Sequence, residues 1–317
     1  MNKDLLSVAD LTKKEMDDLF KLAVRIKKPT KKGRSPKLLA DRTLMMIFEK
    51  PSLRTRVTFE TGMTQLGGHA IFMETLLGKR ESTPDIARNL CRWVDLIMAR
   101  TFAHKSVTEM AEHATVPVIN ALSDLEHPCQ ILADFLTILE HKRKLKGLKL
   151  VYVGDGNNVA NSLLLAAATQ GMNMTVACPQ GYDPDKGVWA KAHALAAKSK
   201  CHLAIVRDPR EAVKGADVVY TDVWASMGQE SEKELRARIF APYQVNAQLM
   251  GLAKKDAMFL HCLPAHRGDE VTDDVLDGPQ SQVLDEAENR MHIQKAIMVT
   301  LYKYWQKNKG KYLRKKK

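Results

Sequence analysis

The sequence has no hydrophobic run of the length that crosses a membrane. None of its apolar stretches approaches the roughly 20 residues that a bilayer-spanning helix needs. The first four residues, Met1 to Asp4, also lack the continuous apolar core of a secretory signal peptide. We therefore expect no membrane association and a cytoplasmic location.

Cysteine is scarce and irregularly spaced. The chain has five cysteines, an odd number, at Cys91, Cys129, Cys178, Cys201 and Cys262. Their positions give neither a disulfide framework nor the paired spacing of zinc ligands. We infer a reducing compartment, and we expect no metal site and no cofactor.

Acidic residues are outnumbered, and the excess of basic residues is concentrated at one end. The formal net charge is +12, and residues 307–317 alone carry seven basic side chains and no acid. No aromatic platform of the kind that stacks on bases accompanies this tail. We expect a solvated terminus there, and we do not expect nucleic-acid binding.

The remaining composition is that of a globular protein, with 45% hydrophobic and 27% charged residues. A length of 317 residues suits two domains of about 150 residues each. A capping box at residues 12–15 predicts a first amphipathic helix, and residues 27–36 indicate a basic loop.

Short apolar runs then alternate with helical patterns in two series. The first series predicts strands at 43–48, 70–73, 96–99 and 116–119. The second predicts strands at 149–153, 174–177, 202–206, 218–221 and 258–261. This alternation predicts an α/β fold of two domains, each a parallel sheet flanked by helices. In such sheets, ligands bind beyond the carboxyl ends of the strands.

The segment from Ser52 to Arg56 lies at such a strand end, where a helix begins. Free backbone N–H groups and the positive end of the helix dipole favour an anion there. Ser52 and Thr55 add hydroxyl donors, and Arg54 and Arg56 add guanidinium groups that match phosphate oxygens. Arginine at a helix N-terminus opposes the dipole, so the pattern favours a bound phosphate over a merely solvated basic turn.

Four further segments follow predicted strands or open a helix. They contribute Arg100, the pair His127 and Gln130 one helical turn apart, Asp222, and Cys262. Each alone has an ordinary explanation. A strand-end arginine is commonly part of a surface ion pair, and a histidine before proline is commonly a helix cap. Asp222 could be a turn residue, and Cys262 could be a small buried apolar side chain.

Two other chemistries are disfavoured by the sequence. The loop at residues 154–158 lacks the third glycine of a dinucleotide fingerprint, and the next strand has no acidic residue at its end, which argues against nicotinamide binding. His261 and Cys262 are adjacent on a segment predicted to be extended, so their side chains should point to opposite faces. A histidine-activated cysteine nucleophile is therefore not expected.

Together these segments resemble the aspartate/ornithine carbamoyltransferases, and within them the ornithine enzymes. The resemblance extends from about Leu5 to Tyr302. Residues 52–56 and 127–130 mark the superfamily, whereas residues 226–228 and 261–264 distinguish the ornithine enzymes from aspartate and putrescine relatives. Further matches are Arg100, residues 155–158, residues 222–225 and residues 288–290.

The resemblance implies a first domain of residues 1–140 that binds carbamoyl phosphate and is completed by a C-terminal helix, residues 286–317, packing back on it. The implied ligands to carbamoyl phosphate are Ser52, Leu53, Arg54, Thr55, Arg100, His127, Gln130 and Arg290, together with Cys262 and Leu263 from the second domain. Arg100 and His127 would polarise the carbonyl oxygen and stabilise the oxyanion of a tetrahedral intermediate. Gln130 would orient the carbamoyl NH₂ group.

The second domain, residues 141–285, would by the same resemblance bind L-ornithine. The implied contacts are Asn158 and the Met227 backbone to the carboxylate, Asp222 and Ser226 to the α-ammonium, and Cys262 with the Leu263 carbonyl toward the δ-amine. The catalytic set is Arg54, Arg100, His127, Asp222 and Cys262. The δ-amine must lose a proton before it attacks, and the sequence leaves Cys262 and Asp222 as alternatives for assisting this step.

One position departs from the family pattern. Where many ornithine enzymes bring a glutamine from a neighbouring subunit to the phosphate, this chain has Leu76, which has no hydrogen-bonding side chain. Lys79 or Arg80 is a candidate replacement. The resemblance still implies a homotrimer or a multiple of trimers.

The implied reaction is direct attack of the ornithine δ-amine on carbamoyl phosphate, giving L-citrulline and phosphate, as a step of arginine metabolism whose direction the sequence does not reveal. N-acetylornithine and putrescine are alternative amines, and a non-catalytic binding protein of the same fold is another alternative. Asp222 argues against both other amines, because neither has a charged α-ammonium group to bind. The polar groups Arg54, His127 and Cys262 are all retained, which argues against the binding protein.

Overall fold

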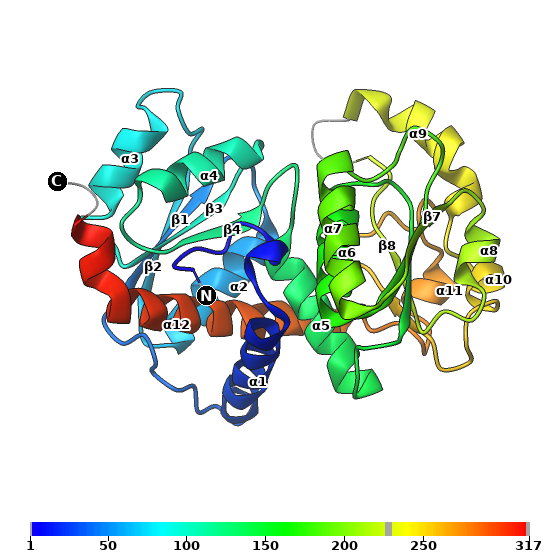
Figure 1. Ribbon diagram of the computed structural model, residues 1–317, viewed down its shortest axis with the longest axis horizontal. Coiled ribbons are helices and arrows are strands. Elements are labelled where there is room, and N and C mark those ends of the chain that lie inside the picture. Colours follow the sequence, from blue (N-terminus) through cyan, green and yellow to red (C-terminus); the bar gives the residue numbers. More distant parts are fainter. Residues whose placement is uncertain (1, 226–229, 315–317) are drawn as a thin grey trace. The chain divides into compact units, whose positions relative to one another are not determined.

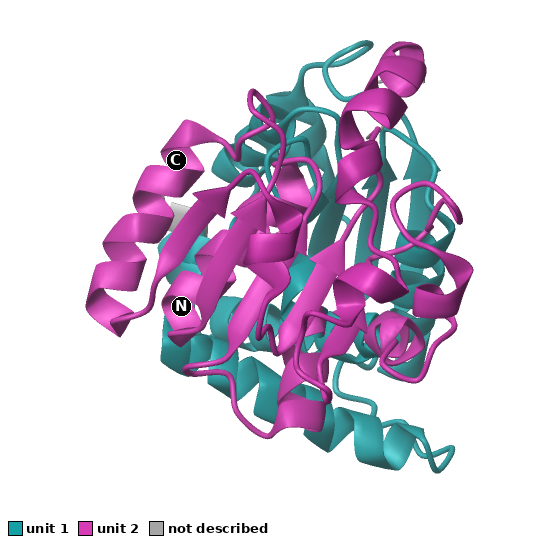
Figure 2. Ribbon diagram, turned by 90° about the vertical axis from the view of Figure 1, so that its right-hand side faces the viewer, with its two compact units in different colours: residues 1–133, 289–317 teal, residues 134–288 magenta. Residues whose placement is uncertain are grey.

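The computed structural model describes residues 2–225 and 230–314 (Figure 1). The chain divides into two compact units: unit 1 comprises Met1–Ala133 with Asn289–Lys317, and unit 2 comprises Asp134–Glu288 (Figure 2). In the described part of the chain, no helix is both long and apolar enough to cross a membrane.

Unit 1 is built on a four-stranded parallel sheet in the order β2-β1-β3-β4. The strands are β1 (Thr43–Phe48), β2 (His69–Glu74), β3 (Leu96–Arg100) and β4 (Val118–Leu122). Every residue of the inner strand β3 is buried, as expected for a strand covered on both faces. The edge strand β4 is also fully buried, and Leu5 pairs with its outer edge at Ile119. Strand β4 begins two residues later than predicted, because Pro117 has no N–H to donate to the ladder and contributes only its carbonyl, to Ile97.

The helices of unit 1 include α1 (Lys13–Thr30), α2 (Leu53–Gln65), α3 (Thr83–Leu90), α4 (His104–His113) and the part of α12 (Val283–Arg314) that follows Glu288. A short 3₁₀ helix, η1 (Val8–Asp10), precedes α1. Helix α12 packs back on this unit: Lys295 Nζ donates to Gln65 Oε1 at the end of α2, and Trp305 Nε1 donates to the Thr115 carbonyl at 2.6 Å. The predicted two-domain α/β fold with a returning C-terminal helix is confirmed.

Helix α1 begins with the predicted capping box, formed by Thr12 and Glu15, but it ends later than expected. The sequence indicated a loop from Lys27, whereas the helix continues to Thr30 with Pro29 inside its last turn. The buried stripe extends to Ile26, and Thr30 Oγ1 bonds the Ile26 carbonyl at 2.8 Å. At the end of a helix, proline costs only one backbone bond, on a side where water can replace it.

Unit 2 is built on a five-stranded parallel sheet in the order β7-β6-β5-β8-β9. The strands are β5 (Lys149–Val153), β6 (Asn173–Ala177), β7 (Leu203–Val206), β8 (Val218–Thr221) and β9 (Met258–Leu260). Strand β9 ends one residue before the predicted boundary. The His261 N–H is taken by Glu286 Oε2 at 3.1 Å and does not continue the ladder.

The helices that lie in unit 2 are α6 (Asn158–Gln170), α7 (Lys186–Ser199), α8 (Pro209–Val213), α9 (Lys233–Phe240), α10 (Ala247–Met250) and α11 (Asp273–Leu276), and α5 (Pro128–Lys142) enters the unit at Asp134. Two 3₁₀ helices, η2 (Glu230–Glu232) and η3 (Ala241–Tyr243), flank α9. Helix α6 ends as predicted at Gly171, whose φ of 74° is the left-handed conformation that glycine adopts at a helix C-terminus.

The strand order fixes where each unit can bind a ligand. In unit 1 the chain passes from β1 to one side for β2 and then to the other side for β3, so the order reverses between β1 and β3. In unit 2 the same reversal lies between β5 and β8. In parallel α/β sheets, ligands bind beyond the carboxyl ends of the strands at such a reversal.

Candidate active site

The anion-binding segment predicted after β1 forms the first turn of α2, at the reversal point of unit 1. Ser52 is the N-cap, and its Oγ accepts from the Thr55 N–H at 3.3 Å and donates to Thr55 Oγ1 at 3.0 Å. Arg290 of α12, itself 3% exposed, donates from Nη2 to the same Thr55 oxygen at 3.0 Å. The first turn of α2 contains no acidic residue. A positive helix end, two hydroxyls and a buried guanidinium thus meet at one place.

Arg56 does not take the role that the sequence suggested for it. Its guanidinium lies over the Phe72 ring at 3.8 Å, and its Nε bonds Glu60 Oε2 at 3.3 Å on the exposed side of α2. The side chains at positions 54 and 56 point in different directions from the helix, because two residues correspond to about 200° of rotation. Leu53 has no polar side-chain atom, so it can offer an anion only its backbone N–H; its side chain is 76% exposed.

Three residues that are predicted to act on a carbonyl group lie buried in unit 1. Arg100 ends β3, His127 directly precedes α5, and Gln130 lies in its first turn. Burial, followed by the positive charges of Arg290 and Arg100, lowers the pKa of His127 well below its usual range. His127 is therefore a neutral imidazole at neutral pH. Such an imidazole can donate a hydrogen bond to a developing oxyanion without first binding a proton.

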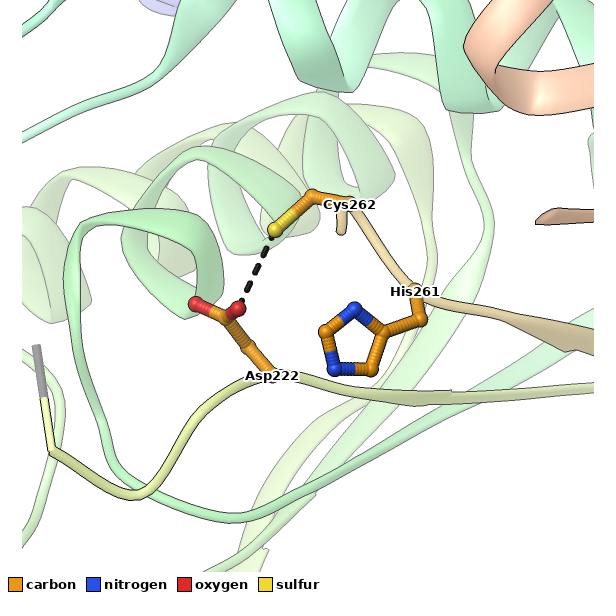
Figure 3. Close-up of side chains that lie close together, drawn as sticks. All are labelled: Asp222, His261 and Cys262. Carbon is orange, nitrogen blue, oxygen red and sulfur yellow. Dashed lines mark hydrogen bonds between the residues drawn. The ribbon is translucent and has the colours of Figure 1, made fainter. Parts of the chain in front are cut away.

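In unit 2, Asp222 follows β8 at the reversal point of the sheet and joins two other polar groups. Its Oδ1 accepts from the Cys262 thiol at 3.1 Å (Figure 3), and its Oδ2 accepts from Asn157 Nδ2 at 2.8 Å. Burial and the Asp222 charge raise the pKa of Cys262 well above its usual range. The sulfur is thus a thiol that donates a hydrogen bond to Asp222, which disfavours a thiolate nucleophile.

His261 lies closer to Cys262 than the extended segment predicted. One ligand atom each from Asp222, His261 and Cys262 lie within 4.8 Å of one another (Figure 3), and His261 and Cys262 lie beyond the end of strand β9 at Leu260. Both ring nitrogens nevertheless have other partners. The Leu263 N–H donates to Nδ1 at 2.9 Å, which places the ring proton on Nε2, 3.2 Å from Glu270 Oε1.

Two groups of side chains in the described part of the chain have ligand atoms close enough together to hold a metal ion. The group Asp222, His261 and Cys262 is one cluster with metal-ligand spacing, and His266, Asp269 and Glu270 form another. Sequence spacing did not reveal either, because the first joins two segments 40 positions apart and the second is a turn without cysteine. In the first, an ion would have to displace the hydrogen bonds on the thiol and on Nδ1.

The remaining predicted residues are placed as follows. Asn158 is half-buried at the start of α6, and Leu263 has a left-handed φ of 56° before a cis bond to Pro264. Ser226 and Met227 lie outside the described residues. Leu76 is 42% exposed, and Lys79 and Arg80 are exposed in the same loop.

Three side chains at the site were not singled out from the sequence. Asn157 caps α6 and bonds Asp222, and its position at a strand end was the available signal. Glu270 and Glu286 bond His261 from the turn after β9 and from α12, and nothing local in the sequence marks them. Burial and then the nearby Asp134 carboxyl raise the pKa of Glu286 well above its usual range.

Comparison with known proteins matches two successive parts of the chain to two domains of one family. Residues 3–140 match the carbamoyl-P binding domain of aspartate/ornithine carbamoyltransferase, and residues 146–301 match its Asp/Orn binding domain. The chain belongs to the aspartate/ornithine carbamoyltransferase family. An ornithine carbamoyltransferase of Anoxybacillus flavithermus is 54% identical over 302 residues, which cover 94% of this chain and 96% of that protein.

Solved structures of carbamoyltransferases agree with the fold. The ornithine carbamoyltransferase from Pyrococcus furiosus superposes with a TM-score of 0.91 at 54% identity, covering 93% of this chain and 95% of that one. An acetylornithine transcarbamylase complexed with acetylcitrulline has a TM-score of 0.86 at 34% identity, covering 94% and 98%. Carbamoyltransferases that differ in their amine substrate therefore share this fold, and the choice of amine must come from individual side chains.

Proposed function

We propose that the protein transfers the carbamoyl group of carbamoyl phosphate to the δ-amine of L-ornithine, giving L-citrulline and phosphate. The observation that carries this proposal is the Asp222 carboxylate, held by Cys262 and Asn157 beside the end of β8. It provides a negative charge for an amino-acid ammonium group, in a chain whose other unit has a built anion cradle at Thr55.

The phosphate of carbamoyl phosphate would bind at the first turn of α2. The backbone N–H groups there, the Ser52 and Thr55 hydroxyls, and the Arg54 and Arg290 guanidinium groups offer donors to a dianion. Phosphate is also the leaving group, so these donors stabilise the charge that grows as the bond to the carbonyl carbon breaks. Stabilisation is then greater in the transition state than in the bound substrate.

The carbonyl group would be polarised by Arg100 and the neutral His127. An imidazole with a lowered pKa donates a hydrogen bond without transferring its proton to the oxyanion. Gln130, fully buried one turn along α5, would fix the carbamoyl NH₂ group with its side-chain oxygen.

The attacking amine must be neutral, although a free alkylamine is mostly protonated near pH 7. Of the two candidates for assisting deprotonation, the geometry favours Asp222. A thiol whose pKa is raised well above its usual range keeps its proton. Cys262 already uses that proton in its hydrogen bond to Asp222. Cys262 would orient the carboxylate, and the Leu263 carbonyl would orient the amine.

We retain the predicted domain boundaries as part of the proposal: residues 1–140 with 286–317 for carbamoyl phosphate, and residues 141–285 for ornithine. Asn158, Ser226, Met227 and Asp222 would bind the amino-acid end of ornithine. We also propose that the reaction occurs in the cytoplasm as a step of arginine metabolism, in either direction. Recovery of the protein in the membrane or secreted fraction would contradict this location.

A homotrimer, or a multiple of trimers, is also proposed, with the number taken from the family resemblance. Unit 1 supports association, since it exposes large apolar side chains along edge strand β2 and the adjacent start of α2. They are Leu53, Val57, Ile71, Met73 and Leu76, each at least 40% exposed. The exposed Lys79 and Arg80, beside Leu76, would reach the phosphate site of a neighbouring copy.

Assembly is tested by light scattering coupled to size-exclusion chromatography. We expect a mass of three times 35.6 kDa, or a multiple of it. Met73→Lys should lower that mass, because a charge would be buried in the interface. A wild-type protein that is monomeric at micromolar concentration would contradict the proposal.

Citrulline formation from carbamoyl phosphate is the direct test of the reaction. The purified protein is assayed in parallel with ornithine, N-acetylornithine, putrescine and aspartate. We expect turnover with ornithine at least a hundredfold faster than with any other amine. N-acetylornithine and putrescine have no charged α-ammonium to pair with Asp222, and aspartate has no second amine to attack carbamoyl phosphate. Preference for another amine would overturn the roles in unit 2, and no transfer to any amine would favour the non-catalytic alternative.

A further inference from the structure

A second cluster of metal-ligating side chains lies in unit 2 on the turn that follows the Cys262 segment. One ligand atom each from His266, Asp269 and Glu270 lie within 4.8 Å of one another. Two hydrogen bonds fix the backbone of this turn. Gly268 N–H donates to the Val271 carbonyl at 2.9 Å, and Gln244 Nε2 donates to the Asp269 carbonyl at 2.9 Å. The three side chains are therefore presented by an ordered backbone.

Glu270 distinguishes this cluster from an ordinary group of surface acids. Its side chain is fully buried, with 0% exposure. Oε1 accepts from the His266 N–H at 2.5 Å and from His261 Nε2 at 3.2 Å. Oε2, in contrast, is buried without a hydrogen-bond partner and lies 3.7 Å from His266 Nδ1. A buried carboxylate oxygen left without a partner is costly unless something outside the chain satisfies it.

The charges around the cluster are also uncompensated. The neighbouring Arg267 is turned away, with Nη1 at 2.6 Å from both Asp273 and Asp277. Among residues 2–225 and 230–314, no lysine or arginine lies within 4 Å of the Asp269 or Glu270 carboxylate. Two carboxylates and one imidazole thus face one another, and His266 is exposed enough for an ion to reach them.

We propose that His266, Asp269 and Glu270 bind a divalent transition-metal ion, with water completing its coordination. One imidazole nitrogen and two carboxylate oxygens suit Zn²⁺, Co²⁺ or Ni²⁺ better than Mg²⁺ or Ca²⁺, which prefer all-oxygen ligands. Metal–ligand bonds of about 2.1 Å at tetrahedral angles separate two ligand atoms by about 3.4 Å. The 3.7 Å between His266 Nδ1 and Glu270 Oε2 needs only a small adjustment.

The ion would be connected to the segment described above through one carboxylate. Glu270 would bind it with Oε2 while Oε1 holds His261 Nε2–H, and the Nδ1 of that ring holds the Leu263 N–H. A cation on Oε2 withdraws electron density from Oε1 and weakens the bond to His261. The site is distinct from the group of Asp222, His261 and Cys262, with which it shares no residue, and it does not rest on the proposed reaction.

The test measures Co²⁺ binding to the full chain, without a histidine tag, by calorimetry and visible absorption. Cys262→Ala serves as the background, since it removes the thiol ligand of the other cluster. We expect one Co²⁺ per chain in this background, with a spectrum that lacks a sulfur-to-cobalt charge-transfer band. Adding His266→Ala or Asp269→Asn should weaken binding at least tenfold.

His202→Ala, which changes an exposed histidine elsewhere in unit 2, is the matched control and should leave binding within twofold. His266 and Asp269 are on the surface side of the cluster, so their variants should keep the wild-type circular dichroism spectrum. Absence of Co²⁺ binding in the Cys262→Ala protein would overturn the proposal. Binding that survives both His266→Ala and Asp269→Asn would also overturn it.

Discussion

Replacing Arg54 with alanine is expected to lower kcat/KM for carbamoyl phosphate about a thousandfold, or about 4 kcal/mol. Arg54 lies in the first turn of α2, where the Ser52 and Thr55 hydroxyls and the Arg290 guanidinium converge. In the proposed reaction, a guanidinium group at that place would stabilise the departing phosphate more than the bound substrate, so kcat should fall with kcat/KM. Initial rates of citrulline formation at varied carbamoyl phosphate concentration measure both constants.

Arg56→Ala is the matched control, because it removes the same side chain two residues further along the same helix. Its guanidinium contacts Phe72 and Glu60 on the exposed side. We expect a loss of less than tenfold and a small change in stability, as for an exposed ion pair. Equal losses in the two variants would show that the helix end acts only through its overall charge, and the assignment of Arg54 would be wrong.

Asp222→Asn is expected to lower kcat/KM for ornithine at least a hundredfold, about 3 kcal/mol, while carbamoyl phosphate binding changes less than threefold. Asparagine can keep both neighbours, with its oxygen toward Asn157 Nδ2 and its NH₂ group toward the Cys262 sulfur. The loss therefore reports the missing negative charge. Steady-state kinetics with ornithine and calorimetry with carbamoyl phosphate separate the two effects.

Asp217→Asn is a control from the other end of the same strand. Asp217 and Asp222 flank β8 and are both 6% exposed, but Asp217 bonds Lys254 Nζ at 2.6 Å and the Lys149 N–H at 2.8 Å. Loss of this carboxylate should lower the thermal midpoint and leave the KM for ornithine within twofold. If Asp222→Asn instead weakened both substrates equally, the assignment of Asp222 to ornithine would be wrong.

The strands could be predicted from the sequence because buried parallel strands are continuous apolar runs. β1, β5 and β8 have the predicted bounds. The short helices α9, α10 and α11 could not be located in this way. They are 8, 4 and 4 residues long, too short for helical periodicity to be distinguished from a loop. The prediction that α1 ends before Pro29 was wrong, because the last turn of a helix tolerates a proline.

The site was predictable to the extent that its residues follow strands. Ser52 follows β1, Arg100 ends β3, and Asp222 follows β8. The strand order places these residues at the reversal points of the two sheets. The contacts of His261 were not predictable. They depend on Glu270, which lies nine positions away on a turn, and on Glu286 of helix α12. No local sequence pattern encodes such pairs.

The path of α12 bears on how the protein can be made. Unit 1 is formed by the first 133 residues together with the last 29, and its anion cradle includes Arg290. Before α12 has been synthesised, the surface of α2 that Lys295 later contacts has no helix to cover it. Unit 2 is one continuous segment of the chain. It can therefore fold before unit 1 is complete, although it is translated after the N-terminal part of unit 1. The N-terminal half therefore stays incomplete until helix α12 has been synthesised.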